Sequence, residues 1–111
     1  HPNRALEVIN EVPADKLDHW LLYRRAEAEL ALGMSKALAT AKDALAGAQE
    51  DLRAKKNLAA YFDMMSRCLS AAGETKDAVD NTRLALAHCS GGRFQRELTN
   101  RLASLEAAEQ S

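Results

Sequence analysis

The apolar residues of this chain are almost all alanine and leucine, and this choice constrains the fold more than any other feature. Ala occurs 22 times and Leu 16 times, whereas Val and Ile together occur only four times in 111 residues. Strands are enriched in β-branched residues, whereas Ala and Leu are strong helix formers. The sequence therefore predicts an all-α domain, which at this length can bury one core without disulfides or metal.

Helix-breaking residues are few, so the expected helix boundaries can be placed directly. Prolines occur only at positions 2 and 13, and glycines only at 33, 47, 73, 91 and 92. Asp15, Ser35 and Thr75 are residue types that cap helix N-termini, and a glycine is a common helix terminator. We expect six helices: about 3–12, 15–32, 35 to 47–50, 51–72, 75–89 and one after Gly92, whose polar end (106–111) frays or faces solvent.

The connections between these segments are about two to four residues long, which predicts that consecutive helices pack as antiparallel hairpins. Such hairpins either close into one bundle or stack in a row. An internal repeat favours the stack. When Gly33 is placed over Gly73, 40 residues later, the size class of the side chain is kept at most matched core positions. A spacing of 40 residues lies within the range of helical repeat arrays.

The matched segments share a small residue in the first helix, a closing Gly and alanines in the second helix. The second copy has Ser66, Gly73, Ala78, Ala85 and Leu86 in this arrangement, and the first has Ala26, Gly33, Ala37, Ala44 and Leu45 with one turn residue fewer. This pattern resembles the tetratricopeptide repeat (TPR) family, most closely its long-helix variants in bacterial regulators and motor-protein light chains. Residues 3–12 resemble the second helix of a preceding repeat.

The resemblance implies a single domain over residues 1–111, built as a short right-handed solenoid of about two and a half repeats. It also implies that the first helix of each pair lines a concave groove that holds an extended peptide or a partner helix. The positions that it places in this groove are Tyr23, Arg24, Glu27, Leu30, Asp63, Met64, Arg67 and Ser70, with Trp20 at the rim and Arg96 and Asn100 continuing the row.

The side chains that carry chemistry do not form a recognisable catalytic or metal-binding pattern. His88 and Cys89 are sequence neighbours, so on a helix they point about 100° apart and cannot hold one ion together. Cys68 and Cys89 lack a C-x-x-C spacing, which favours two buried thiols. Gly91 and Gly92 are not followed by the Lys-Ser/Thr pair of a phosphate-binding loop. We therefore expect no enzyme activity, no metal and no cofactor.

Four further polar positions receive an ordinary structural interpretation. We expect His19 to be a surface or boundary residue. Asp51 lies with Glu50 in the most polar stretch of the chain, and Arg53 follows it, so this stretch is interpreted as a solvated link between two helices.

The charge balance bears on partners and location. The 15 basic and 16 acidic residues give a net charge of -1, which provides no field for nucleic acid or anionic membrane. No apolar run approaches the roughly 18 residues of a membrane span, and the first residues do not resemble a signal peptide. We expect a cytoplasmic protein. Because the sequence does not begin with Met, we also expect a fragment of a longer chain.

The leading hypothesis is a non-catalytic scaffold or adaptor module that binds a protein or peptide in the groove. The alternative is a sensory or oligomerisation domain of a larger bacterial regulator, which could associate with itself through exposed solenoid ends. Nucleic-acid binding through Arg93, Arg96 and Arg101 ranks last, because acidic residues are interleaved with them.

Overall fold

The computed structural model describes residues 1–110, and in these residues the chain forms helices and no strands. Its α-helices are α1 (Pro2–Asn10), α2 (His19–Ala31), α3 (Ala37–Glu50), α4 (Leu58–Ala71), α5 (Thr75–His88) and α6 (Gly92–Glu109). Two short 3-10 helices, η1 (Ala14–Lys16) and η2 (Leu52–Asn57), precede α2 and α4. The prediction of an all-α chain with six helices is confirmed over the described residues.

Two of the predicted helix starts are wrong, for the same reason. The segments after Pro13 and after Glu50 begin as separate 3-10 helices. Extended backbone at Leu17 (ψ 102°) separates η1 from α2, whereas extended backbone at Asp51 (ψ 110°) precedes η2, which runs directly up to α4. Helix α2 therefore starts only at His19, where the Asp18 carboxylate caps it by accepting the Leu21 amide at 2.9 Å. Helix α4 starts only at Leu58.

The predicted caps at Ser35 and Thr75 are also wrong. The residue before α3 is Lys36 and the residue before α5 is Glu74, and neither side chain caps the helix with a hydrogen bond. Both helices instead follow tight turns directly. The first amide of α3, that of Ala37, is satisfied by the Met34 carbonyl at 3.2 Å, and in α5 the Glu74 carbonyl accepts the first helical bond from the Ala78 amide at 3.0 Å.

The two glycine turns have the same geometry, as the sequence alignment predicts. Gly33 has φ +70° and Gly73 has φ +82°, the left-handed region that ends a helix at low cost only for Gly. After each glycine, the next amide returns to a carbonyl five residues back, from Met34 to Glu29 and from Glu74 to Leu69, at 2.9 Å in both cases. Both glycines are therefore confirmed as helix terminators.

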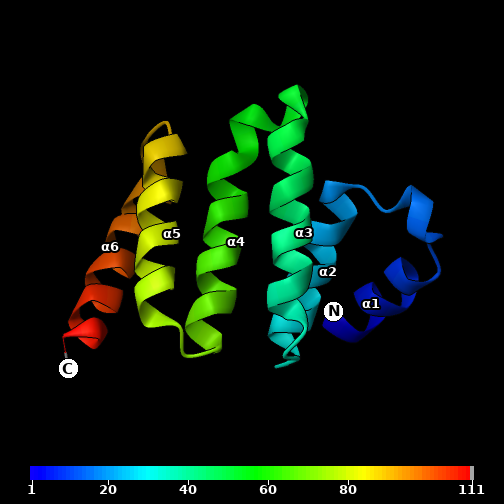
Figure 1. Cartoon of the computed structure of the whole chain (residues 1–111), viewed down its shortest axis with the longest axis horizontal. Coiled ribbons are helices and arrows are strands. Elements are labelled where there is room, and N and C mark those ends of the chain that lie inside the picture. The colour runs from blue at the N-terminus through cyan, green and yellow to red at the C-terminus, as the bar shows by residue number, and fades with distance from the viewer. Residues whose placement is uncertain (111) are drawn as a thin grey trace.

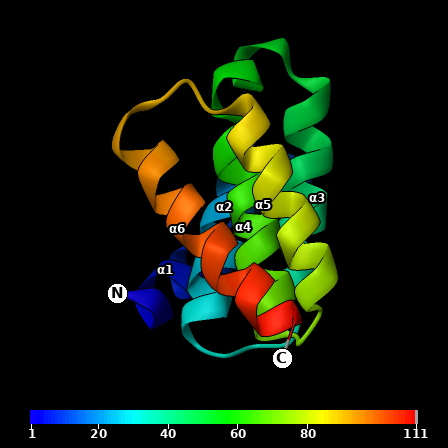
Figure 2. The ribbon, with the colours of Figure 1, turned by 90° about the vertical axis from the view of Figure 1, so that its left-hand side faces the viewer.

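Each helix packs chiefly on its neighbours in the chain. The most extensive packing joins α2 with α3 and α4 with α5, as in two antiparallel hairpins, and α4 also contacts α2 and α3. The helices lie in a row in chain order (Figure 1), within extents of 42 × 30 × 21 Å. Turned by 90°, α3 and α5 lie on one side of the molecule and α1 and α6 on the other (Figure 2).

Helix α4 lies at the centre of the core, and nine of its 14 residues are buried. The alanines predicted to allow close helix packing are buried with it: Ala26, Ala37, Ala44, Ala78 and Ala85 are at most 3% exposed. Ser66 replaces an alanine in the second copy, and its hydroxyl bonds the Thr82 hydroxyl at 2.6 Å and the Ala78 carbonyl at 3.0 Å. The polar pair inside the core is therefore satisfied.

No helix in the described part of the chain is long and apolar enough to cross a membrane.

Candidate partner-binding surface

The structure separates the predicted groove positions by exposure. Arg24, Arg96 and Asn100 are exposed, whereas Tyr23, Glu27 and Arg67 are half-buried. Asp63 is 5% exposed and Met64 is 1% exposed, so these two predictions of a partner-facing side chain need correction. The physical reason is the central place of α4, which contacts α2, α3 and α5 and has little surface left.

Asp63 instead holds two arginines in place. Its carboxylate pairs with Arg67 one turn along α4, at 3.4 Å, and with Arg101 of α6. We call Asp63, Arg67 and Arg101 the arginine cluster. The two arginine side chains are 33% and 32% exposed, so each guanidinium has one side on Asp63 and another toward solvent.

The charges of the arginine cluster do not balance. One carboxylate faces two guanidiniums, which leaves one positive charge at the joint between α4 and α6. Burial lowers the pKa of Arg101 from its usual value, and the guanidinium remains charged at neutral pH. A guanidinium has five donors in a fixed plane, so each arginine retains N–H groups beyond those that face Asp63.

Helix α6 extends this positive surface. Arg96 and Asn100 line a shallow hollow of about 500 Å³ together with Gly92, Gln95 and Thr99. Neither Arg96 nor Asn100 has an ion-pair or hydrogen-bond partner among residues 1–110, so the donors of both side chains are free. Arg101 of the arginine cluster lies on the same helix as the hollow, whereas Asp63 and Arg67 lie on α4.

The α2 part of the predicted row is less available. Arg24 is paired with Glu27 at 3.3 Å, an exposed pair of low energetic value. The Tyr23 ring packs against Tyr61 and Trp20, with ring centroids 5.2 and 6.1 Å apart. Tyr23 therefore belongs to an aromatic cluster, and Trp20, which is 46% exposed, is its most accessible member.

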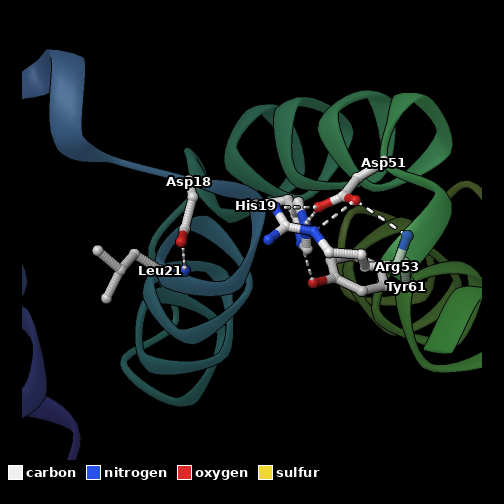
Figure 3. A network of polar contacts seen from close by, with 6 residues as sticks. All are labelled: Asp18, His19, Leu21, Asp51, Arg53 and Tyr61. Carbon is white, nitrogen blue, oxygen red and sulfur yellow. Dashed lines mark hydrogen bonds and ion pairs between the residues drawn. The ribbon is translucent and has the colours of Figure 1, made fainter.

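A network of polar contacts that the sequence analysis missed lies beside this aromatic cluster (Figure 3). Nδ1 of His19 lies 2.6 Å from the Tyr61 hydroxyl, and Nε2 lies 2.9 Å from Asp51 Oδ2. Arg53 contributes its backbone amide and its guanidinium to the same carboxylate, at 3.0 and 3.1 Å. The network joins the start of α2, the end of α3 and the first turn of α4.

The structure places His19 at the boundary of the core, as expected, and adds a role for Asp51 that was not expected. The His19 side chain is 13% exposed. Glu50 and Arg53 are exposed, as expected for a solvated link, whereas Asp51 is half-buried and bonded to His19. Gly47 permits the approach of α2 to α3, because a Cβ at that position would lie 3.2 Å from the His19 Cβ. The signal in the sequence is weak, since His19 and Asp51 are 32 residues apart.

The electrostatics of the network favour a structural role. Hydrogen bonds from Arg53 and then from His19 hold the pKa of Asp51 well below its usual range. Burial raises the pKa of Tyr61 to about 12, so the phenol stays neutral at physiological pH. A carboxylate is an acceptor only, so Nε2 of His19 carries the proton that it donates to Asp51, and Nδ1 is placed to accept from the Tyr61 hydroxyl. Both ring nitrogens are thus engaged, and the network fixes three helices instead of presenting a free base.

The remaining candidates for chemistry are dispersed. Within residues 1–110 no three His, Cys, Asp or Glu side chains lie close enough to hold a metal ion. Cys68 is buried, as predicted, whereas Cys89 is half-buried, and both are free thiols. His88 is the last residue of α5 and stacks on Phe62, with a centroid distance of 5.2 Å.

Comparison with known proteins gives no relative for this chain: no family model, no curated protein and no solved structure matches it.

Proposed function

We propose that this chain is a non-catalytic protein-interaction module that binds an acidic peptide or partner helix across α4 and α6. The observation that carries the proposal is the arginine cluster, in which one buried carboxylate fixes two guanidiniums and leaves a positive charge. Arginine is the residue type best suited to planar, bidentate recognition of a carboxylate.

The proposal includes a TPR-like stack of helix pairs as the scaffold. Two observations support this architecture: the glycine turns 40 residues apart have the same hydrogen bonds, and the matched small residues Ala26 and Ser66 are both fully buried. In such a stack, α2, α4 and α6 are the first helices of successive pairs. Their shared face is the groove in which TPR-like proteins hold partners.

A bound segment meets two kinds of group on this face. Its carboxylates pair with Arg67, Arg101 and Arg96, and its backbone or polar side chains bond Asn100 in the α6 hollow. Asp63 does not contact the partner. It orients the arginines in advance, which lowers the entropy cost of binding.

A random-peptide phage library tests the proposal without a known partner. The wild type is expected to select peptides enriched in Asp and Glu, and the selected peptides are then titrated against purified protein by calorimetry. Loss of two charge-assisted contacts weakens binding by about tenfold or more, so Arg67→Gln/Arg96→Gln is expected to show that loss. Helicity measured by circular dichroism confirms that the variant is folded.

A matched control removes the same charge from the other side of the molecule. Lys42 of α3 and Lys76 of α5 are exposed and have no ion-pair partner in the described chain, so Lys42→Gln/Lys76→Gln keeps the peptide affinity. Equal losses in the two double variants would show a nonspecific charge effect. Selected peptides without acidic residues would contradict the assigned role of the arginines.

A further inference from the structure

A separate cavity lies where the first helix pair meets the second, between the α2–α3 turn and the last turns of α4. Its volume is about 260 Å³, and its walls are Leu30, Gly33, Met34, Ser35, Ala37, Leu38, Cys68, Ala71 and Ala72. None of these side chains is charged, in contrast to the α6 hollow and the cavity beside Trp20. We call it the apolar cavity.

Small residues make the room in this cavity. Gly33, Ala37, Ala71 and Ala72 contribute at most one methyl group each, which leaves space between the α2–α3 turn and α4. The positive φ of Gly33 bends the chain around the opening, and nothing lies within 4 Å of the Cβ that another residue would add there. The cavity is therefore a consequence of how the glycine turn faces α4.

Water is a poor occupant of such a space. The cavity opens to solvent, because four of its wall residues are exposed: Gly33, Ser35, Ala71 and Ala72. An ordered water inside it needs two to four polar partners. Here the side-chain polar groups are the Ser35 hydroxyl at the exposed edge and the Cys68 thiol, a weak donor that is 3% exposed. The wall chemistry thus favours an apolar guest.

We propose that the apolar cavity binds one small apolar ring system, of about the size of indole. Leu30 and Leu38 supply the fixed apolar walls, and Met34, half-buried at the opening, adapts its flexible side chain to the ring. The guest contacts residues of α2, α3 and α4, so it joins the two helix pairs. This site shares none of the residues of the arginine cluster and does not depend on peptide binding there.

The ring comes either from a free small molecule or from an aromatic side chain of a partner protein. Both sources offer the same chemistry to the cavity. Indole and N-acetyltryptophanamide separate them, because the second probe has the peptide groups that a partner's side chain carries into the site.

Methionine methyl NMR gives the direct test, since the chain has only three methionines. Met34 lines the cavity, whereas Met64 and Met65 lie in the core at 1% and 7% exposure and serve as internal references. Titration with indole is expected to shift the Met34 methyl resonance saturably, with a dissociation constant on the order of 1 mM for a nine-atom ligand.

Two thiols in one molecule give an independent measurement. N-ethylmaleimide alkylates the two thiols, and peptide mass spectrometry measures the rate at each. The rate at Cys68 is expected to fall in proportion to the fraction of empty cavities, which is roughly tenfold when the indole concentration is ten times the dissociation constant. Cys89 lies on a different cavity, with His88 and Phe94, and its alkylation rate stays unchanged.

Variants at exposed alanines decide the location. Ala71→Leu places a larger side chain at the cavity edge and abolishes the indole response, whereas Ala103→Leu, on exposed α6 surface, retains it. Met34→Phe fills the opening from the other side and is a second blocking variant. Because it lacks the Met34 methyl group, its response to indole is measured only by the alkylation rate of Cys68. No saturable shift up to 10 mM indole, or equal responses in the blocking and control variants, overturns the proposal. Tighter binding of N-acetyltryptophanamide than of indole assigns the site to a partner's side chain, and the reverse assigns it to a free ligand.

Discussion

Removal of one hydroxyl from the polar network tests whether that network stabilises the fold. Tyr61 is 1% exposed, and its hydroxyl lies 2.6 Å from Nδ1 of His19. Tyr61→Phe keeps the ring, and with it the aromatic contacts to Tyr23 and Trp20. The variant therefore isolates a single hydrogen bond.

The expected cost follows from the burial of the group left behind. Without Tyr61, Nδ1 of His19 is an unpaired acceptor on a side chain that is only 13% exposed. A buried acceptor without a hydrogen-bond partner lowers the free energy of unfolding by about 1–3 kcal/mol. Because Nδ1 has partial access to water, we expect Tyr61→Phe to lower it by about 1.5 kcal/mol. For a domain of this length that corresponds to a fall of about 6 °C in the unfolding midpoint.

Urea denaturation followed by circular dichroism measures the change, with Tyr23→Phe as the matched control. The Tyr23 hydroxyl makes no hydrogen bond with another part of the described chain, so its removal is expected to cost less than about 0.5 kcal/mol. A double-mutant cycle that combines Tyr61→Phe with His19→Ala is expected to give a coupling energy of about 1 kcal/mol between the two side chains. If Tyr61→Phe is no more destabilising than Tyr23→Phe, or if the coupling is zero, the network does not hold the helices together.

Three further outcomes are expected. Because the pKa of Asp51 is lower in the folded chain than in the unfolded one, its stabilisation is present at pH 6 and is lost as the pH falls below about 4, so Asp51→Asn narrows the difference in unfolding free energy between pH 6 and pH 3. The pKa of Tyr61 is higher in the folded chain than in the unfolded one, so the free energy of unfolding falls as the pH rises from 10 to 12. Absorbance at 295 nm is expected to show a phenol that titrates at about pH 12 in the wild type and is absent from Tyr61→Phe. Gly73→Ala is expected to cost about 1 kcal/mol in urea denaturation, entirely from the backbone, because no atom lies within 4 Å of the added Cβ at φ +82°.

Local features of the fold could be predicted from the sequence because the forces that cause them act over a few residues. The glycine turns at 33 and 73 depend on the preference of one residue type for positive φ, and the structure shows the same bonds at both. The start of α2 was predicted incorrectly because two local signals competed. Asp15 and Asp18 are both N-capping types, and the extended backbone at Leu17 decides in favour of Asp18.

The polar network could not be predicted because its members come from distant parts of the chain. His19, Asp51 and Tyr61 belong to three elements, and only the packing of α2 on α3 brings the histidine to the carboxylate. Each of these residues, taken alone, is of a type that is common on solvated surfaces. The close approach of α2 to α3 requires that residue 47 has no side chain. A glycine inside a helix does not show which residue of another helix will pack against it.

The arginine cluster shows why a periodic pattern assigns partner-facing residues incorrectly on a central helix. Helical periodicity separates an apolar face from a polar face only when one side of the helix is buried. Helix α4 is covered on several sides, so Asp63 and Ser66 are buried with its apolar residues, and the Asp63 carboxylate needs a counter-charge. Arg67 on the same helix pairs with it, and α6 supplies Arg101. The proposed function therefore assigns the choice of partner to the charge that remains after this pairing, and not to the spacing of residues along α4.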